Sequence, residues 1–362
     1  MISTVTRLTL LSLVLALFGC GNEGPSGLPV LGAGDHTSAA VEILTIVGPD
    51  VLHSPTDLAF RPDAPNELWV TMRTANAILV IDEPGTPAQR SMEYAALGNV
   101  HFLPAPSALA FGTADRLATI HEIDVPTQRE TPWDFMGPTL WPTDRGLFDG
   151  GHASHMDMLH NTPNGIGIAW EQGNVYWIVD GQHGSITRYD FVADHGPGQH
   201  DHSDGIISRY VEGQIGYVEG VPAHAELDHA TGLLYVADPG NRRVVALDIA
   251  SGTRGAEMGP NYDGCEMFVM NDATLTTFVD GATMNLVQPS GIALHDGYLF
   301  VSDHATSVIA AFDLLTGTLV DWIGLHDVVP PGGLGGIDFD QEGRLFVTDI
   351  AGQRVLRLAP RL

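Results

Sequence analysis

The chain has 362 residues, with 44 acidic and 16 basic side chains that give a formal net charge of −28 at pH 7. Every basic residue is an arginine, and no basic patch is interleaved with aromatic residues. We therefore exclude nucleic acid as a partner and expect a surface that attracts cations around a large core.

The N-terminus is organised like a targeting segment. Arg7 is its only charge, and the apolar run over residues 8–18 is too short to span a bilayer comfortably. The run ends in Leu-Phe-Gly-Cys, which resembles the bacterial lipobox, in which the cysteine is lipidated and becomes the mature N-terminus. We predict a lipoprotein signal peptide over residues 1–19 and lipidation of Cys20, with an ordinary secretory signal as the alternative.

Lipidation of Cys20 would decide whether the chain can form a disulfide and where in the cell the protein is held. The other cysteine of the chain is Cys265, so no internal disulfide could form. Residues 20–40 lack periodicity, and we expect a flexible tether there. The mature protein would be lipid-anchored in the bacterial cell envelope, at the outer membrane or periplasmic face, without a transmembrane helix.

Residues 41–362 contain six copies of one repeated unit. Each copy starts with a short apolar strand, and a second strand follows after a turn. The first strands are PTDLAF (55–60), PSALAF (106–111), PNGIGIAW (163–170), AHAELD (223–228), PSGIAL (289–294) and LGGIDF (334–339). The second strands are ELWVTM, RLATIH, NVYWIVD, LLYVAD, YLFVSD and RLFVTD. Repeats of short strands with this spacing predict an all-β fold, a six-bladed β-propeller.

Further strands complete most of the copies. Third strands occur in five copies, but the second copy has no clean third strand over residues 121–135. Outer strands GIISRYVEG, TLTTFVDG and TLVDWIG follow copies three, four and five. The sixth copy runs out of chain after its third strand. We predict that VEILTIVG (41–48) supplies its fourth strand and closes the ring, which leaves no bare sheet edge.

The segments LLYVADPGNRRVVALD and RLFVTDIAGQRVLRLA resemble the NHL-repeat family of six-bladed propellers. The resemblance covers nearly everything after residue 40 and implies an NHL-like fold without identifying an activity. Four copies carry an aspartate after the second strand, and we interpret these as structural residues that accept backbone N–H bonds and fix the next turn. They are Asp180, Asp238, Asp303 and Asp349.

Histidines are concentrated between residues 151 and 205. Seven of the sixteen lie there: His152, His155, His160, His183, His195, His200 and His202. In a propeller, the inner strands start on one face, here called the top face, and the loops between second and third strands return to it. This rule puts His155, His160 and His224 on the top face, and His195, His200 and His202 on the opposite face.

The top-face histidines predict a metal site. Neutral imidazole binds Zn²⁺, Cu²⁺ and Fe²⁺, and three or four donors from separate segments suffice. We predict that His155, His160 and His224 hold such a divalent metal, with His53, His183 and His304 as reserve ligands. The alternative is a polar docking surface without a metal.

The turn over residues 193–205 forms a second possible metal site on the opposite face. Its candidate ligands are Asp194, His200, Asp201, His202 and Asp204. Imidazole could bind a transition metal there, or the three carboxylates could bind Ca²⁺. A polar turn on an acidic protein is the interpretation we favour.

Among NHL-type propellers, the arrangement most resembles peptidyl-hydroxyglycine amidating lyase, whose zinc is held by histidines in the second place of PHxLA motifs. Those places here are Thr56, Ser107, Asn164, His224, Ser290 and Gly335. Only His224 matches, so the resemblance does not imply the lyase activity. Gluconolactonase-type propellers hold calcium through acidic and amide side chains, and Asp57 and Asn164 match two of those places.

Two classes of function remain. The sequence has no GxSxG elbow and no glycine-rich phosphate loop, so we expect neither nucleophilic catalysis nor a nucleotide cofactor. The first class is a membrane-tethered propeller whose top face binds a metal, a small molecule or a docking protein. The second is a metal-dependent lyase or hydrolase that uses the same face. The incomplete zinc triad favours binding, and whether the protein is an enzyme stays open.

Overall fold

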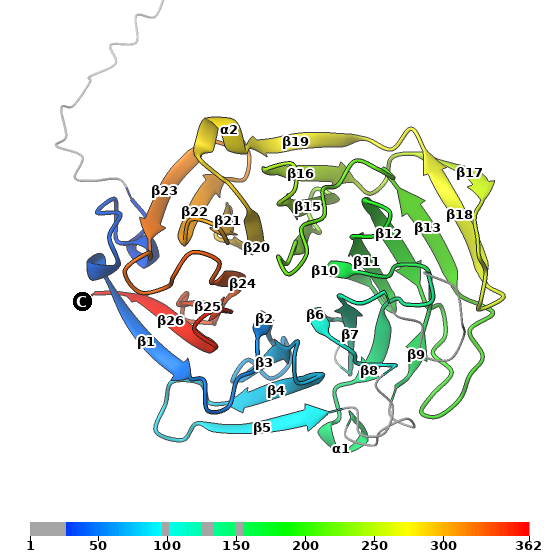
Figure 1. Ribbon diagram of the computed structural model, residues 1–362, viewed down its shortest axis with the longest axis horizontal. Helices are drawn as coiled ribbons and strands as arrows, with labels where there is room; N and C mark the ends of the chain where they lie inside the picture. Colours follow the sequence, from blue (N-terminus) through cyan, green and yellow to red (C-terminus); the bar gives the residue numbers. More distant parts are fainter. Residues whose placement is uncertain (1–26, 96–100, 114, 125–133, 149–154, 362) are drawn as a thin grey trace, which may run out of the picture.

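The computed structural model describes residues 27–95, 101–113, 115–124, 134–148 and 155–361. Six β-sheets are arranged in a ring around a central axis (Figure 1), so the predicted six-bladed β-propeller is confirmed. Helical structure in these residues is limited to the single turns α1 (Arg145–Phe148) and α2 (Gly281–Met284) and the 3₁₀ turns η1 (Pro29–Leu31) and η2 (Ser38–Ala40).

Each blade begins at the axis with its innermost strand. Blade one contains β2 (Pro55–Phe60), β3 (Glu67–Met72), β4 (Ala77–Asp82) and β5 (Arg90–Ala95). Blade four contains β14 (Ala225–Asp228), β15 (Leu233–Asp238), β16 (Arg243–Asp248) and β19 (Leu275–Asp280). Blade five contains β20 (Pro289–His295), β21 (Tyr298–Asp303), β22 (Val308–Asp313) and β23 (Leu319–Gly324).

Blades two and three depart from the regular pattern. Blade two has β6 (Pro106–Phe111), β7 (Arg116–His121), β8 (Thr139–Pro142) and a two-residue outer strand β9 (Asp157–Met158). Its third strand therefore lies beyond the segment in which we found none. Blade three has β10 (Gly165–Gln172), β11 (Val175–Asp180), β12 (Ser185–Asp190) and β13 (Ile206–Tyr210). A hairpin from the following repeat, β17 (Thr253–Glu257) and β18 (Glu266–Asn271), extends this sheet through parallel β13–β18 pairing.

The last blade is built from both ends of the propeller. It contains β24 (Leu334–Phe339), β25 (Leu345–Asp349) and β26 (Arg354–Pro360). The N-terminal strand β1 (Val41–Val47) pairs antiparallel with β26, from Val41 opposite Pro360 to Val47 opposite Val355. As the outermost strand of this sheet, β1 occupies the place that VEILTIVG was predicted to take (Figure 1).

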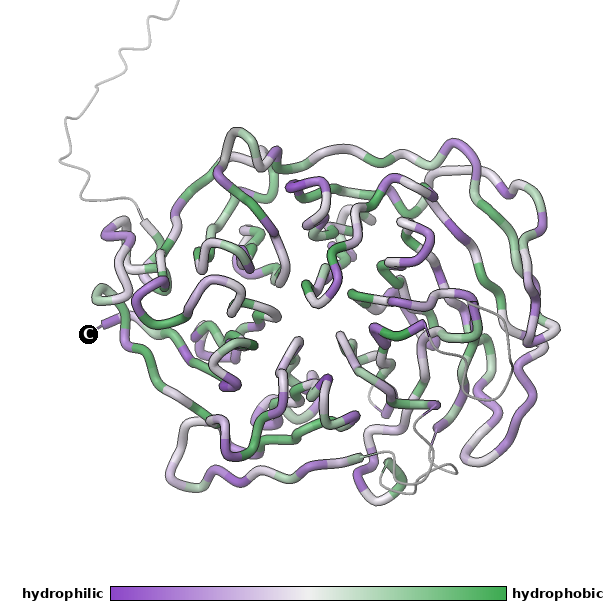
Figure 2. The backbone as a smooth tube through the Cα atoms, in the orientation of Figure 1, coloured by the Kyte–Doolittle hydropathy of each residue, from purple (hydrophilic) through white to green (hydrophobic). Residues whose placement is uncertain are grey.

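The hydrophobic core is divided among the interfaces between neighbouring blades. Six clusters of buried residues each combine side chains from two adjacent sheets. Second strands such as β11 are buried along their whole length because both faces pack against neighbours, which explains their continuous apolar sequence. The outer strand β5 is exposed along most of its length. Figure 2 shows hydrophobic residues distributed through every blade instead of gathered at one centre.

The aspartates that follow the second strands have the structural role we predicted. Asp238 accepts hydrogen bonds from the Gly216 backbone N–H at 2.7 Å and from Arg243 Nε at 2.8 Å. Asp349 accepts from the Gly352 backbone N–H and Arg354 Nε, both at 2.7 Å. Both carboxylates are fully buried. They fix the turns between second and third strands.

The segment before the first strand differs from the flexible tether expected over residues 20–40. Residues 27–40 pack on the sixth and fifth blades, and Leu31 is fully buried in the cluster between those blades. The Leu28 backbone N–H donates to Asp321 at 2.7 Å, and the Ser38 hydroxyl donates to Asp327 at 2.6 Å. The signal peptide and Cys20 lie outside the described residues. Within the described part of the chain, no helix has the length and hydropathy needed to cross a membrane.

Candidate functional site

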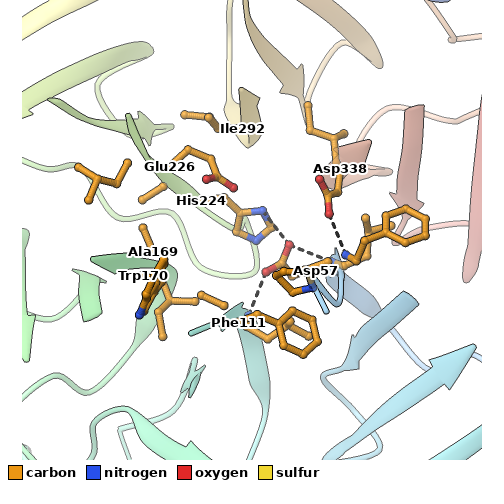
Figure 3. Close-up of a pocket in the computed structure, with 18 of the residues that line it drawn as sticks. Asp57, Phe111, Ala169, Trp170, His224, Glu226, Ile292 and Asp338 are labelled. Carbon is orange, nitrogen blue, oxygen red and sulfur yellow. Dashed lines mark hydrogen bonds and ion pairs between the residues drawn. The ribbon is translucent and has the colours of Figure 1, made fainter. Parts of the chain in front are cut away.

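A pocket of about 190 Å³ lies on the axis of the ring, where the innermost strands converge (Figure 3). The polar residues of its lining are Asp57 on β2, His224 just before β14, Glu226 on β14, His229 in the turn after β14 and Asp338 on β24. Most of the other lining residues lie toward the C-terminal ends of the innermost strands, next to the turns that lead to the second strands. The pocket therefore extends toward the face opposite the one on which we expected the site.

Two of the pocket carboxylates connect innermost strands that form no ladder with each other. Asp57 Oδ2 accepts the Leu109 backbone N–H of blade two at 2.9 Å. Asp338 Oδ2 accepts the Phe60 backbone N–H of blade one at 2.8 Å. These contacts hold three adjacent blades around the axis, so both carboxylates have a structural role in addition to lining the pocket (Figure 3).

His224 and Glu226 keep hydrogen-bonding capacity in the pocket. His224 Nδ1 lies 3.3 Å from Asp57 Oδ1, while its Nε2 is buried and has no hydrogen-bond partner among the described residues. The Glu226 carboxyl forms no hydrogen bond or ion pair within the described part of the chain. Buried polar atoms are nearly always paired. The His224 imidazole and the Glu226 carboxyl are therefore both available to hydrogen-bond a ligand that enters the pocket.

Burial of several acids in one place raises their pKa values. Burial, followed by the nearby charges of Asp338 and Asp57, raises the pKa of Glu226 to about 8. Burial raises the pKa of Asp338 to about 7, although two backbone N–H donors oppose the shift. Burial also raises the pKa of Asp57, against the charge of His224. The pocket therefore holds protons near neutral pH, which a cation could replace.

Aromatic side chains also line the pocket. Phe60, Phe111 and Trp170 line it, and they occupy the same place near the end of the innermost strand in blades one, two and three. The sequence motifs show this equivalence as LAF, LAF and IAW. The repeat thus presents three aromatic side chains to the same cavity as the carboxyl groups (Figure 3).

The structure does not assemble the predicted metal site from His155, His160 and His224. His155 and His160 flank β9, the outermost strand of blade two, while His224 adjoins the innermost strand of blade four (Figure 1). The top-face assignment of His155 and His160 requires their loop to lead directly into the innermost strand of blade three, but β9 intervenes. The error arose because a two-residue strand gives no periodic signal.

The predicted separation of histidines on opposite faces is also wrong. The His155 ring lies 6.4 Å from the His200 ring, and the His160 ring lies 6.4 Å from the His202 ring, between centroids. The loop over residues 191–205 folds back against the outer strand of blade two. Faces assigned by connectivity do not hold for a loop of that length.

The reserve ligands are occupied or remote from one another. His53 is exposed before β2. His183 Nδ1 contacts Asp180 at 2.7 Å, and its Nε2 contacts Asp134 at 3.4 Å. Burial lowers the pKa of His183, but these two carboxylates outweigh it and raise the pKa to about 9, so the ring is a cation at neutral pH. His304 Nδ1 donates to the Leu334 carbonyl at 2.8 Å.

The second predicted site is only partly brought together. Asp194 pairs with Arg116 at 2.8 Å, Asp201 accepts from Ser203, and Asp204 accepts the Ala193 backbone N–H. These three carboxylates thus serve different partners. His202 instead approaches Asp157 and His195, and these form the one group of three ligand-type residues, within 4.8 Å of one another, in the described part of the chain.

Sequence reasoning missed Glu226 and Asp338 at the axis and Asp157 and His195 at the rim. Glu226 and Asp338 interrupt otherwise apolar innermost strands, which is a signal that alignment of the repeats could have used. Of the places compared with the lyase motif, only His224 directs a titratable side chain into the pocket. Asn164 is not among the residues that line the pocket, and its backbone carbonyl accepts the Gly181 N–H at 3.0 Å.

Comparison with known proteins supports the fold. No family model and no curated protein matches the sequence. An auxiliary nutrient binding protein from Bacteroides ovatus shares 13% identity with a TM-score of 0.55, covering 89% of this chain and 77% of that one. Virginiamycin B lyase from Staphylococcus aureus shares 11% identity with a TM-score of 0.53, covering 88% and 98%. A luciferin-regenerating enzyme shares 11% identity with a TM-score of 0.54, covering 88% and 95%.

The chain is a six-bladed β-propeller with NHL-like structural neighbours. At these identities, the likeness of the propeller to each neighbour shows the fold alone. The predicted NHL-like architecture is therefore confirmed. The function of the propeller has to be argued from its own residues.

Proposed function

We propose that this propeller is a ligand-binding protein whose axial pocket takes a small organic cation. The observation that carries the proposal is the convergence of three carboxyl groups and three aromatic side chains on one cavity of about 190 Å³. Such a cavity suits a compact molecule with one cationic group. The strongly negative chain, at −28, would also raise the local concentration of cations.

The pocket offers a cation two kinds of stabilisation. Phe60, Phe111 and Trp170 line the cavity, and contact of an ammonium group with an aromatic face is worth up to about 2 kcal/mol when desolvated. Glu226 can ionise to neutralise the charge, because a nearby cation lowers the pKa that burial has raised. His224 Nε2 remains to hydrogen-bond a polar group elsewhere on the ligand.

Calorimetric titration with choline and with its neutral isostere 3,3-dimethylbutan-1-ol tests the proposal. We expect choline to bind with release of protons, seen as an enthalpy that depends on the ionisation heat of the buffer. Glu226→Gln should weaken binding, while Glu342→Gln, which alters a carboxyl whose side chain is 65% exposed, should not. Equal binding of the two probes, or no effect of Glu226→Gln, would contradict a cation site.

A metal-dependent lyase or hydrolase is the second candidate, and the Asp57–His224 pair favours it. His224 Nε2 would be a ligand for a divalent transition-metal ion, with Asp57 orienting the ring through Nδ1, and Glu226, protonated at neutral pH, could act as the general acid. Turnover that EDTA abolishes and that Glu226→Gln removes without loss of binding would identify this class.

We infer that the propeller acts at the bacterial cell envelope, held there by lipid on Cys20. The Leu-Phe-Gly-Cys sequence supports the inference. A tethered binding propeller would capture small molecules near the membrane. A single anchor and an acidic body are consistent with a protein that leaves its pocket accessible to the surrounding solution.

A further inference from the structure

The outer rim between blades two and three, well separated from the axial pocket, carries a second group of titratable side chains. Asp157 on β9 meets His195 and His202 from the loop over residues 191–205. We call these three residues the rim site. Asp157 Oδ1 lies 2.7 Å from His202 Nδ1 and 4.0 Å from His195 Nε2. The Asp157 side chain is 1% exposed and the His195 side chain 2% exposed.

His195 is arranged to present a lone pair. Its Nδ1 lies 2.6 Å from the Gly196 carbonyl oxygen. A carbonyl oxygen can only accept a hydrogen bond, so Nδ1 carries the proton and donates. In the neutral ring the lone pair is therefore on Nε2, which is buried and has no hydrogen-bond partner in the described residues. At 4.0 Å from this nitrogen, Asp157 Oδ1 is too far away to form a hydrogen bond with it. A carbonyl that orients the second nitrogen is a feature of histidines that bind metals.

We propose that the rim site binds one divalent transition-metal ion of the Zn²⁺ and Fe²⁺ class through Asp157, His195 and His202. Two imidazoles and one carboxylate suit such ions, whereas Ca²⁺ takes oxygen ligands. Ligand bonds of about 2.0–2.2 Å place the donor atoms about 3–4 Å apart. The donor atoms already lie within 4.8 Å of one another, so each donor atom has to move by under about 1 Å to reach metal-ligand spacing.

The surroundings favour a metal centre over a surface contact. Asp263, from the loop between β17 and β18, accepts His160 Nδ1 at 2.7 Å, and the His160 ring packs against His202. The His155 ring lies 5.0 Å from the His195 ring. Three segments from different repeats thus enclose the site, while the His202 side chain, 18% exposed, gives access from solvent. A bound ion would take the place of the hydrogen bond between His202 Nδ1 and Asp157 Oδ1.

The bound ion would connect two blades. Asp157 belongs to the outer strand of blade two, and the two histidines belong to blade three. Because β9 has only two residues, little backbone pairing holds it to its own sheet. An ion that binds only the folded arrangement stabilises it by mass action. Metal binding should therefore raise the melting temperature of the propeller.

The test is a titration of chelator-treated protein with Zn²⁺, followed by calorimetry, and with Co²⁺, followed by its visible absorption. We expect one ion per chain. His195→Ala and Asp157→Asn should each weaken binding by more than about 100-fold, beyond the 10–100-fold loss typical of outer-shell residues. His53→Ala removes an exposed histidine and serves as the matched control. Circular dichroism checks that each variant folds, and Asp157→Asn preserves shape where His195→Ala does not.

Three results would overturn the proposal: no ion bound, unchanged affinity in both variants, or equal binding of Ca²⁺. Glu226→Gln separates this site from the axial pocket. Zn²⁺ affinity lost in Glu226→Gln but kept in Asp157→Asn would place the ion at the axis and refute the rim site. Choline binding that fails while Zn²⁺ binds at the rim would refute only the axial proposal.

Discussion

Replacement of Glu226 by glutamine tests the electrostatics of the axial pocket directly. In the folded chain, burial and then the charges of Asp338 and Asp57 raise the pKa of Glu226 from 4.5 to about 8. Between these two values the folded state binds more protons than the unfolded state. The free energy of unfolding therefore falls as the pH rises from about 4.5 to about 8, and the loss is complete above the folded pKa.

The size of the effect follows from the shift. One pKa unit corresponds to about 1.4 kcal/mol, so the full change from 4.5 to about 8 corresponds to about 5 kcal/mol. Glu226 is partly accessible through the pocket, and solvent screening reduces this to about 2–3 kcal/mol. Glu226→Gln keeps the shape and removes the charge. The variant should therefore match wild type near pH 5 and exceed its stability by about 2–3 kcal/mol at pH 9.

Urea unfolding at pH 5, 6, 7, 8 and 9 measures this difference. Asp338 and Asp57 stay in both proteins, so their own titrations largely cancel in the comparison. Glu342→Gln alters a carboxyl whose side chain is 65% exposed and should follow the wild-type curve. Parallel pH curves for wild type and Glu226→Gln, or a variant that is less stable at pH 9, would refute the assignment of a buried, protonated glutamate.

Two further predictions concern the ends of the chain. Deletion of residues 41–48 should uncover the edge of β26, lower the melting temperature and cause association that depends on protein concentration, while a chain that lacks only residues 1–26 should show neither effect. An unchanged melting temperature after the deletion would show that β1 does not hold the ring closed. Cys20→Ser should move the protein from the membrane fraction to the soluble fraction, and a variant that still fractionates with membranes would show that the lipobox interpretation is wrong.

The sequence by itself determined the architecture because its signals are local. Strand alternation, turn residues and the aspartates after the second strands recur within each repeat, so six copies could be aligned without knowledge of their contacts. The place of β1 beside β26 also followed, since a sheet that ends one strand short has only the other end of the propeller to complete it. These features depend on neighbours in the chain or on ring closure.

The sites were decided by the tertiary structure, because their residues meet only when the ring is closed. Glu226, Asp57 and Asp338 come from blades four, one and six, and no spacing in the sequence relates them. At the rim, the two-residue strand β9 and a loop of irregular length bring Asp157 to His195 and His202. Strand periodicity says nothing about where such a loop folds, so the sequence could not show which histidines lie close together. Their proximity is set by packing between blades, which no local sequence pattern encodes.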